Sequence, residues 1–331
     1  MKHGAGIYKM AKKLGCKSSE IIDFSSNINS YDTQLEITPS RELLVKYADS
    51  SYSKLKKIIA DKYQIKKKQI ALYNGATSAI FELIRSLKEK EICLYAPLYG
   101  EYEKAAKLSS KKIDKINRFK ELYKKPKKNS IVVFVNPSTP DGKFYDLKRL
   151  FELWKKQNCT IILDESFLEF QKLKSLKNHI NSYKKLYIIK SFTKFYACAG
   201  VRIGAIFSHK RNIKTLKTPL WNLSSFDVKY LSKRLQDKAF SKRSKKSHKK
   251  MKKELQHILE KSRLFPKIYE SDSNFILTKS EDAKKIFKHL YKNKILVRTC
   301  GSFDFLTNDY LRFAVKDSIS HKKLQKALNG I

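Results

Sequence analysis

Short apolar runs rich in β-branched residues recur along the first two thirds of the chain. They stand at 70–73, 92–95, 131–135, 160–163, 186–189 and 203–207. Runs of this length, bounded by polar residues, predict buried strands. Longer stretches with apolar residues at helical spacing lie between several of them, at 54–63, 77–87 and 147–157. This alternation of strands and helices predicts parallel βαβ units with helices on both faces of one sheet.

The pattern changes after about residue 215. A basic helical stretch extends to about residue 263, and the segments that follow it predict strands at 274–278, 295–298 and 310–315 and helices at 281–292 and 321–328. We therefore expect an α/β protein with a mostly parallel sheet and a smaller α+β C-terminal domain. The expected divisions are an N-terminal arm over 1–40, a large domain over 41–215, and a small domain over 216–331 that the arm joins.

The charge is strongly positive, with 72 Lys and Arg residues against 31 Asp and Glu residues and a formal net charge of +41. A field of this sign attracts nucleic acid, anionic lipid or phosphorylated metabolites. Most of the excess is lysine scattered along the whole chain, a composition that AT-rich genomes also produce. The densest cluster, 238–253, is typical of a solvated helix face or loop that binds polyanions weakly. Because no nucleic-acid motif is present, we expect no specific nucleic-acid partner, and a basic nucleic-acid-binding protein stays as an alternative of another class.

The sequence contains no apolar run of about 18 residues, so no membrane association is expected. The first residues lack the apolar stretch of a secretory signal, which indicates a cytoplasmic protein. The five cysteines are widely spaced and form no C-x-x-C pair, so neither a disulfide framework nor a metal site is expected.

Candidate chemistry begins where the predicted strands end. Asp164 follows the strand at 160–163, at the end of a strand where open α/β sheets bind ligands. Lys194 follows the strand at 186–189 in the segment Lys190-Ser191-Phe192-Thr193-Lys194. A lysine just past a strand end can be partly desolvated, which lowers its pKa and makes its amine a nucleophile toward an aldehyde.

Three polar side chains near this lysine could converge on a phosphate: Ser191, Thr193 and Arg202. The turn Asn74-Gly75-Ala76-Thr77-Ser78 precedes a predicted helix, so its backbone N–H groups could also face an anion. A further turn, Asn136-Pro137-Ser138-Thr139-Pro140-Asp141-Gly142, follows the strand at 131–135.

The order of these motifs resembles the fold-type I pyridoxal-phosphate (PLP) enzymes of the class I/II aminotransferase superfamily. Within it, the likeness is greatest to the branch of histidinol-phosphate aminotransferases and threonine-phosphate decarboxylases. It covers essentially the whole chain and rests on four segments: His3-Gly4-Ala5-Gly6-Ile7-Tyr8, Asp23-Phe24-Ser25-Ser26-Asn27-Ile28-Asn29, Asp164-Glu165-Ser166-Phe167-Leu168-Glu169-Phe170 and Lys190-Ser191-Phe192-Thr193-Lys194-Phe195-Tyr196-Ala197.

The resemblance implies PLP as the cofactor and a role for each matching residue. Lys194 would carry the cofactor as a Schiff base and later move a proton, and Asp164 would pair with its ring nitrogen. Tyr99 would stack on the ring. The cofactor phosphate would be held by the backbone of Ala76 and Thr77 and by the side chains of Ser191, Thr193 and Arg202.

The resemblance also implies the substrate site and the assembly. Arg312 would bind the α-carboxylate of the substrate and Arg298 its phosphate, while Asn27 and His3 would close the substrate pocket. Tyr52 matches a tyrosine that reaches the cofactor phosphate of the neighbouring subunit, which implies a homodimer with shared active sites.

The chain departs from the family pattern at Thr139. The family has an asparagine there that hydrogen-bonds the 3′ oxygen of the cofactor, and a threonine before the glycine where this chain has Asp141. A threonine hydroxyl can donate one hydrogen bond, so Thr139 is expected to bind the cofactor with altered ring electronics. The loss of the amide could also indicate a changed specificity or a less active relative.

Decarboxylation and transamination begin with the same exchange of amino acid for lysine on the cofactor. They differ in which bond at Cα lies perpendicular to the ring, a small difference in orientation that changes rates greatly. The resemblance favours decarboxylation of a small phosphorylated amino acid, L-threonine O-3-phosphate or serine phosphate, a reaction of cobalamin synthesis. An aminotransferase of the histidinol-phosphate type is the alternative.

Overall fold

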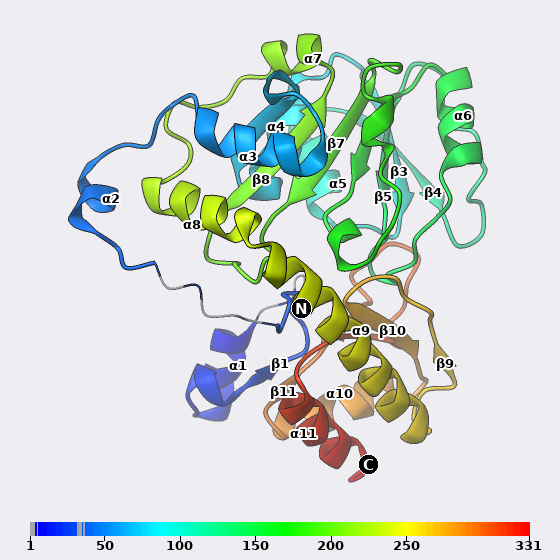
Figure 1. The fold of residues 1–331 in the computed structure, drawn as a ribbon. Coiled ribbons are helices and arrows are strands. Elements are labelled where there is room, and N and C mark those ends of the chain that lie inside the picture. Colours follow the sequence, from blue (N-terminus) through cyan, green and yellow to red (C-terminus); the bar gives the residue numbers. More distant parts are fainter. Residues whose placement is uncertain (1–3, 5, 32–34, 36) are drawn as a thin grey trace. The chain divides into compact units, whose positions relative to one another are not determined.

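The structure is a computed structural model that describes residue 4, residues 6–31, residue 35 and residues 37–331 (Figure 1). The chain divides into two compact units. The first, called the sheet unit here, comprises residues 33–136 and 145–242. The second, called the C-terminal unit, comprises residues 1–32, 137–144 and 243–331.

The sheet unit contains a seven-stranded sheet in the order β2-β8-β7-β6-β5-β3-β4. Its strands are β2 (Ile70–Asn74), β3 (Glu91–Ala96), β4 (Lys112–Asn117), β5 (Ile131–Val135), β6 (Thr160–Asp164), β7 (Leu186–Ser191) and β8 (Ile203–Ser208). β8 is antiparallel to both of its neighbours, β2 and β7, while the remaining pairs are parallel. Every strand except β8 therefore ends at one edge of the sheet, the carboxyl edge, where β8 begins.

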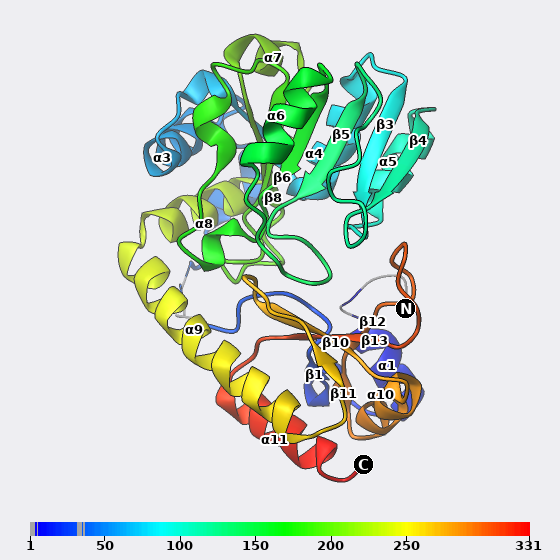
Figure 2. The ribbon, with the colours of Figure 1, turned by 90° about the vertical axis from the view of Figure 1, so that its right-hand side faces the viewer.

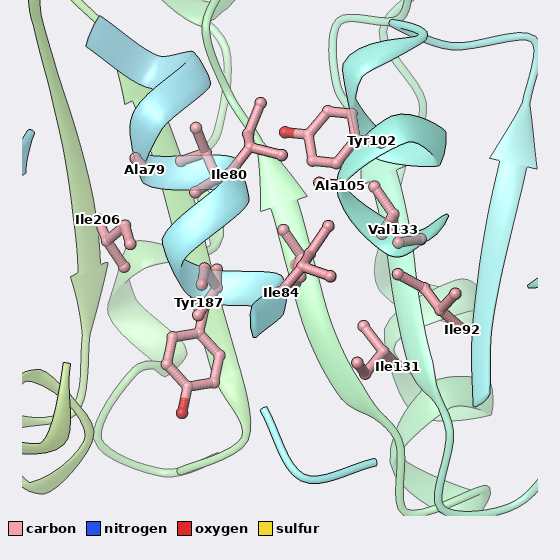
Figure 3. Close-up of a cluster of buried hydrophobic side chains, with 14 of the residues drawn as sticks. Ala79, Ile80, Ile84, Ile92, Tyr102, Ala105, Ile131, Val133, Tyr187 and Ile206 are labelled. Atoms are coloured by element: carbon pink, nitrogen blue, oxygen red, sulfur yellow. The ribbon is translucent and has the colours of Figure 1, made fainter. Parts of the chain in front are cut away.

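Helices cover both faces of this sheet. α4 (Gly75–Ser86) and α5 (Glu101–Leu108) lie on one face, where Ile84 and Tyr102 pack with Ile92 and Val133 of the strands (Figure 3). α3 (Ser53–Tyr63) and α6 (Lys148–Lys156) lie on the other. Trp154 of α6 donates a hydrogen bond of 3.0 Å to the Tyr95 hydroxyl, and Tyr95 faces away from the first cluster because side chains alternate along a strand.

The predicted fold class is confirmed, since the sheet is mostly parallel and has helices on both faces. The expected strands occur with ends that differ by two residues at most, except the one expected at 295–298. That segment forms two short strands, β11 (Ile295–Leu296) and β12 (Arg298–Thr299), which belong to different sheets. β4 is absent from the sequence expectations because its segment, Lys-Ile-Asp-Lys-Ile-Asn, carries three charged residues. It is an edge strand, so only one of its sides pairs and much of it meets solvent.

The C-terminal unit contains an antiparallel sheet in the order β12-β13-β10-β9 and a parallel pair, β1 and β11 (Figure 2). Its strands are β1 (Ile22–Asp23), β9 (Lys267–Ile268), β10 (Phe275–Lys279), β11 (Ile295–Leu296), β12 (Arg298–Thr299) and β13 (Tyr310–Ala314). Its helices are α1 (Ile7–Leu14), α10 (Ala283–Lys292), α11 (Ser318–Leu328) and most of α9 (Lys238–Lys261). Leu259, Ile286 and Leu324 join α9, α10 and α11 in one apolar cluster with Phe313 of β13.

Two segments fall into units that the sequence did not indicate. The sequence places a division near residue 215, at the end of α7 (Lys210–Thr215), whereas α8 (Ser225–Gln236) beyond it also clusters with the sheet unit. Ser225 Oγ donates a hydrogen bond of 2.7 Å to the Lys46 carbonyl, just after α2 (Arg41–Val45), which ties α8 to that unit. Residues 137–144 cluster with the C-terminal unit, where the Asp272 N–H donates to the Gly142 carbonyl at 2.8 Å.

Short 3-10 helices complete the described chain: η1 (Ser18–Glu20), η2 (Lys67–Gln69), η3 (Leu168–Phe170) and η4 (Leu176–His179). Over the residues that the structure describes, no helix combines the length and the apolar character that crossing a membrane requires.

Candidate active site

The first turn of α4 lies against the start of β8 at the carboxyl edge. The Gly75 N–H donates a hydrogen bond of 2.9 Å to the Arg202 carbonyl, and Gly75 has φ +77°, which favours glycine. A Cβ at Gly75 would lie 2.7 Å from Arg202 Nη2, so the guanidinium sits directly over this turn. A Cβ at Gly204 would overlap the Ala76 backbone nitrogen. The two glycines thus allow the backbone and the arginine to come close at the positive end of the helix dipole.

Two hydroxyls stand beside this turn. Ser191, the last residue of β7, is the Cα partner of Gly204 on β8, and its Oγ lies 2.9 Å from Thr193 Oγ1. Both side chains are buried. Because Gly204 also approaches the Ala76 backbone, these hydroxyls, the α4 amides and Arg202 lie close together, and donors of these kinds suit an anion such as a phosphate.

Asp164 is buried at the end of β6. Its Oδ2 accepts a hydrogen bond of 2.8 Å from the Tyr102 hydroxyl, and its Oδ1 accepts one of 2.9 Å from the Ser166 N–H. Burial raises the pKa of the carboxyl, while the hydrogen bonds from Ser166 and Tyr102 act to lower it. The two donors therefore oppose part of the rise that burial causes.

Tyr99 precedes α5 and lies half-buried against the same apolar cluster that α4 and α5 share. Burial raises the pKa of its phenol, and a hydrogen bond with the Thr77 side chain opposes that rise. Arg202 and Asp164 also shift this pKa electrostatically, in opposite directions, so Tyr99 lies within reach of the fields of both.

Lys194 lies half-buried in the connection from β7 to β8, where the Ala197 N–H donates to the Lys194 carbonyl at 3.4 Å. Four residues earlier, Lys190 is buried and makes an ion pair of 3.1 Å with Glu169. Adjacent residues of a strand point to opposite faces, so Lys190 and Ser191 face different sides of β7. The two lysines of this segment thus have different surroundings, and Lys190 already has a carboxylate partner.

Sequence reasoning missed the Tyr102 contact with Asp164 and the Lys190 ion pair. A signal for the first exists: Tyr102 stands three residues after Tyr99, so a helix starting there places both near one side. The second had none, because a lysine among so many is taken as a surface residue.

Arg312 belongs to a second group of predicted residues, which lies in the C-terminal unit. Its Nη1 donates to Thr139 Oγ1 at 3.0 Å and its Nη2 donates to the Ser25 carbonyl at 3.2 Å. Its guanidinium lies 4.8 Å from the centre of the Phe275 ring. The Nε–H is buried and has no hydrogen-bond partner among the described residues. Burial lowers the pKa of this guanidinium to about 10.

Arg298 is the Cα partner of Arg312 across the β12–β13 pair. It is 3% exposed, its Nη2 donates to Ser302 Oγ at 2.8 Å, and burial lowers the pKa of its guanidinium. Residues directly opposite on antiparallel strands point to the same face, which places both guanidinium stems side by side.

The remaining predicted residues have the following surroundings. The Asn27 carbonyl accepts a hydrogen bond of 2.9 Å from Asn274, while its buried Oδ1 has no partner within the described chain. Tyr52 is buried in the sheet unit, and its hydroxyl accepts a hydrogen bond of 3.1 Å from the Leu223 N–H. His3 lies outside the described residues.

The structure therefore gathers the predicted residues into two groups. The sheet unit holds Ala76, Thr77, Tyr99, Asp164, Ser191, Thr193, Lys194 and Arg202 at the carboxyl edge of one sheet, with Tyr52 elsewhere in the same unit. The C-terminal unit holds Asn27, Thr139, Arg298 and Arg312. An anion site, a buried carboxylate and a lysine at one sheet edge suit a phosphorylated aldehyde cofactor with a basic ring nitrogen.

The chain is similar to known proteins over most of its length. The family model of aminotransferase class I and II matches residues 19–331. The adenosylcobalamin biosynthesis bifunctional protein CobDQ of Leptospira interrogans is 31% identical over 99% of this chain, which spans 41% of that protein's length. The threonine-phosphate decarboxylase of Salmonella typhimurium is 22% identical over 99% of this chain and 96% of its own.

A solved structure agrees. The histidinol-phosphate aminotransferase of Clostridium acetobutylicum has a TM-score of 0.81 with this chain at 29% identity, over 94% of this chain and 98% of its own. Since the family model covers most of the chain, and the fold and the site have the arrangement described above, the chain belongs to the aminotransferase class I and II family of PLP-dependent enzymes.

Proposed function

We propose that this enzyme decarboxylates a small phosphorylated amino acid, with L-threonine O-3-phosphate as the first candidate and serine phosphate as the second. The observation that carries the proposal is the pairing of Arg298 with Arg312. Two buried arginines as Cα partners on β12 and β13 offer two guanidinium groups to one ligand. An α-carboxylate and a phosphate on one small molecule match that pair, because each is an anion that a guanidinium binds with two parallel hydrogen bonds.

The residues of the sheet unit fit PLP. Because Gly75 and Gly204 lack a Cβ, Arg202 and the Ala76 backbone come close around the α4 turn, and the donors there suit the cofactor phosphate. When bound, PLP supplies an electron sink for the bond that breaks at Cα. The Asp164 carboxylate would hold a proton on the ring nitrogen, with Tyr102 and Ser166 keeping that carboxylate charged.

The other residues of the sheet unit bind, orient and move protons. The Lys194 amine would attach the cofactor covalently and then, once the substrate replaces it, deliver a proton to Cα. Tyr99 would hold the ring from one face. Decarboxylation needs only this returned proton, whereas transamination needs a lysine that first removes a proton from Cα.

The alternative, an aminotransferase of the histidinol-phosphate type, uses the arginines differently. Histidinol phosphate has a hydroxymethyl group where an amino acid has its carboxylate. Arg298 and Arg312 would then serve two substrates in turn, the phosphate of one and the carboxylate of an amino-group donor. The pair serves both anions at once only with a phosphorylated amino acid, which favours decarboxylation.

The test incubates PLP-loaded protein with L-threonine phosphate and follows release of carbon dioxide without any keto acid. A parallel reaction supplies histidinol phosphate and 2-oxoglutarate and follows glutamate. We expect carbon dioxide and aminopropanol phosphate in equal amounts, lost in Lys194→Ala. Glutamate formation with no carbon dioxide would instead assign the chain to the aminotransferases.

We also propose that the enzyme acts as a homodimer with shared active sites. Large apolar side chains of the sheet unit are exposed in the single chain: Leu44, Val45, Tyr47, Leu220 and Trp221. Tyr47 and Trp221 stack with ring centres 4.4 Å apart, so two of these exposed side chains lie together, and an exposed apolar surface of this kind suits contact with a second copy. Tyr52, beside this region in sequence, would contribute to the partner's phosphate site if its bond to Leu223 opens.

Mixing inactive variants tests the shared site. Lys194→Ala and Tyr52→Phe chains, inactive or impaired as separate homodimers, should regain activity when they are unfolded and refolded together, because one site of each heterodimer has both native residues. No recovery in a mixture shown to contain heterodimers would exclude sharing through Tyr52.

A further inference from the structure

Arg118 is a buried arginine outside the two groups of predicted residues. It follows β4 directly and is 3% exposed. The Arg118 N–H donates a hydrogen bond of 2.9 Å to the Ala96 carbonyl, at the end of β3. Its Nε–H donates one of 3.2 Å to the Pro97 carbonyl. The side chain therefore reaches from β4 to the first residue after β3, within the sheet unit.

The residue that it reaches begins the segment that carries Tyr99. Residues 97–100 connect β3 to α5, and Leu98, between Pro97 and Tyr99, is buried. The far end of the segment is fixed by α5, since the Tyr102 N–H donates to the Tyr99 carbonyl at 3.1 Å. The near end is fixed by Arg118 through the Pro97 carbonyl. The backbone is thus held on both sides of Tyr99, which limits where its ring can lie.

A second hydrogen bond fixes the guanidinium itself. Arg118 Nη1 donates to the Tyr145 hydroxyl at 2.9 Å. The Tyr145 ring packs edge-on against Phe134 of β5, with ring centres 5.5 Å apart. Its backbone pairs with the Asn136 side chain in both directions, at 2.9 and 3.0 Å. Because the donors of an arginine lie in one rigid plane, a fork that bonds two fixed acceptors has few other positions.

The burial of Arg118 indicates that its bonds serve position. A guanidinium loses its hydration in the interior, whereas an apolar side chain of similar volume fills such a space without that cost. The Phe119 ring lies against the guanidinium, with its centre 4.7 Å away. The arginine supplies direction instead, because its two donors hold the Pro97 carbonyl and the Tyr145 hydroxyl at a fixed spacing.

We propose that Arg118 is a positioning residue that fixes the segment from Pro97 to Tyr99 and thereby sets the ring of Tyr99 against the cofactor. The inference rests on the proposed function at one point, the contact of Tyr99 with the cofactor ring. It holds for decarboxylation and transamination alike, since both use the same bound cofactor.

The test is a double-mutant cycle on the dissociation constant of PLP. Its single variants are Arg118→Met, which keeps the length of the side chain and removes the fork, and Tyr99→Leu, which removes the ring. We expect Arg118→Met to weaken PLP about 10-fold where Tyr99 is present, the typical effect of losing a hydrogen bond to a charged group. With Tyr99→Leu the same change should weaken PLP less than about 2-fold, because no ring is left to place.

Three further variants sharpen the comparison. Arg118→Lys keeps the charge without the fork, so it should weaken PLP nearly as much as Arg118→Met. Arg149→Met removes an exposed arginine of α6 that lies over the Tyr123 ring, and it should bind PLP like the wild type. Tyr145→Phe removes only the hydroxyl that Nη1 bonds, and it should weaken PLP about 3-fold, again only with Tyr99 present. It decides the question should Arg118→Met fold poorly.

Circular dichroism in the absorption band of bound PLP gives a readout that a loss of stability alone does not move. The sign and size of this signal depend on how the cofactor ring is oriented in its chiral surroundings. At saturating PLP we expect the signal to change in Arg118→Met and in Tyr145→Phe, and to stay as in the wild type in Arg149→Met.

Three results would overturn the inference: equal weakening with and without Tyr99, an unchanged dichroism signal, or full recovery of PLP binding in Arg118→Lys. Failure of the proposed role of Tyr99 is visible separately, in Tyr99→Leu alone. If that variant binds PLP as tightly as the wild type, Tyr99 does not hold the cofactor ring, and the inference fails with it.

Discussion

The Tyr102 hydroxyl donates a hydrogen bond of 2.8 Å to Asp164 Oδ2, which joins the first turn of α5 to the end of β6. Asp164 is almost completely buried, and burial raises the pKa of its carboxyl. The tyrosine therefore stabilises a charge that its surroundings disfavour. The helix α5 therefore contributes to the electrostatics of the site as well as to the apolar core.

Replacing Tyr102 with phenylalanine removes one of the groups that lower the pKa of Asp164. That pKa should rise further, so the carboxylate of the variant should become protonated at a higher pH than in the wild type. We expect cofactor binding about 10-fold weaker near neutral pH, and its loss in acid to begin at a higher pH than in the wild type. Titration of PLP retention against pH measures both effects.

Tyr95→Phe is the matched control for this prediction. Tyr95 is buried in the same sheet, and its hydroxyl pairs with Trp154 and the Lys124 carbonyl, away from Asp164. It should leave PLP retention as in the wild type. If Tyr102→Phe lost PLP at the same acidic pH as the wild type, the tyrosine would contribute packing alone and would not stabilise the charge of Asp164.

Lys190 lies on the face of β7 opposite to Ser191. Its Nζ lies 3.1 Å from Glu169 Oε1 and 3.9 Å from Glu165 Oε2, with Lys190 and Glu165 both 3% exposed. Burial raises the pKa of Glu165, and Lys190 is the largest opposing cause. Lys190→Met should lower the free energy of unfolding by about 3 kcal/mol, since the buried Glu165 carboxylate loses its strongest counter-charge.

The sign of the pH dependence follows from those carboxylates. A protonated carboxyl needs no counter-charge, so the loss in Lys190→Met should shrink as the pH falls. Denaturant unfolding at several pH values measures it. Lys57 pairs with Asp61 at the same 3.1 Å but is 67% exposed, so Lys57→Met should change stability by less than about 0.5 kcal/mol. Equal losses in the two variants would contradict the role of burial.

Gly75→Ala tests the close approach of Arg202 to the first turn of α4. The substitution imposes a side chain at φ +77° and places its Cβ 2.7 Å from Arg202 Nη2, so the arginine or the turn must move. We expect PLP binding to weaken about 10-fold or more, from strain of about 1–3 kcal/mol. Equilibrium binding of PLP, followed by absorbance, measures the change.

Gly100→Ala provides the control, because a Cβ at Gly100 meets nothing within 4 Å and its φ is −60°. It should bind PLP like the wild type. If Gly75→Ala did the same, the close approach of Arg202 to the α4 turn would have no importance for the cofactor.

The sequence predicted most of the sheet unit because its strands are buried on both faces and read as continuous apolar runs, as at Ile131–Val135. The site residues at its carboxyl edge could be placed for the same reason, since they follow directly on those runs. The strand β4 could not, because four of its six side chains are polar. Lys190 could not either, because burial of a charge depends on partners, Glu165 and Glu169, that only the folded sheet brings beside it.

The division of the chain was harder to predict than its elements. Residues 137–144 cluster with strands more than 120 residues later because Asp272 bonds Gly142 and Phe144. No local pattern reports contacts of that range. The register that opposes Arg298 to Arg312 is likewise a product of the β12–β13 pairing, so the sequence could supply both arginines but not their pairing.

Arg298 should determine whether the enzyme prefers a phosphorylated substrate. Arg298→Met removes a buried guanidinium whose Nη2 donates to Ser302, and with it the group that we assign to the phosphate. We expect the dissociation constant of L-threonine phosphate to rise about 10-fold or more while that of unphosphorylated L-threonine changes little, because only the first ligand has a phosphate. Arg312→Lys should give the opposite pattern, weakening both amino acids and sparing aminopropanol phosphate. Arg211→Met, an exposed arginine of α7, should leave all three ligands unaffected. Equal weakening of threonine and threonine phosphate in Arg298→Met would show that Arg298 does not bind the phosphate. Both guanidinium groups would then be assigned to a single carboxylate.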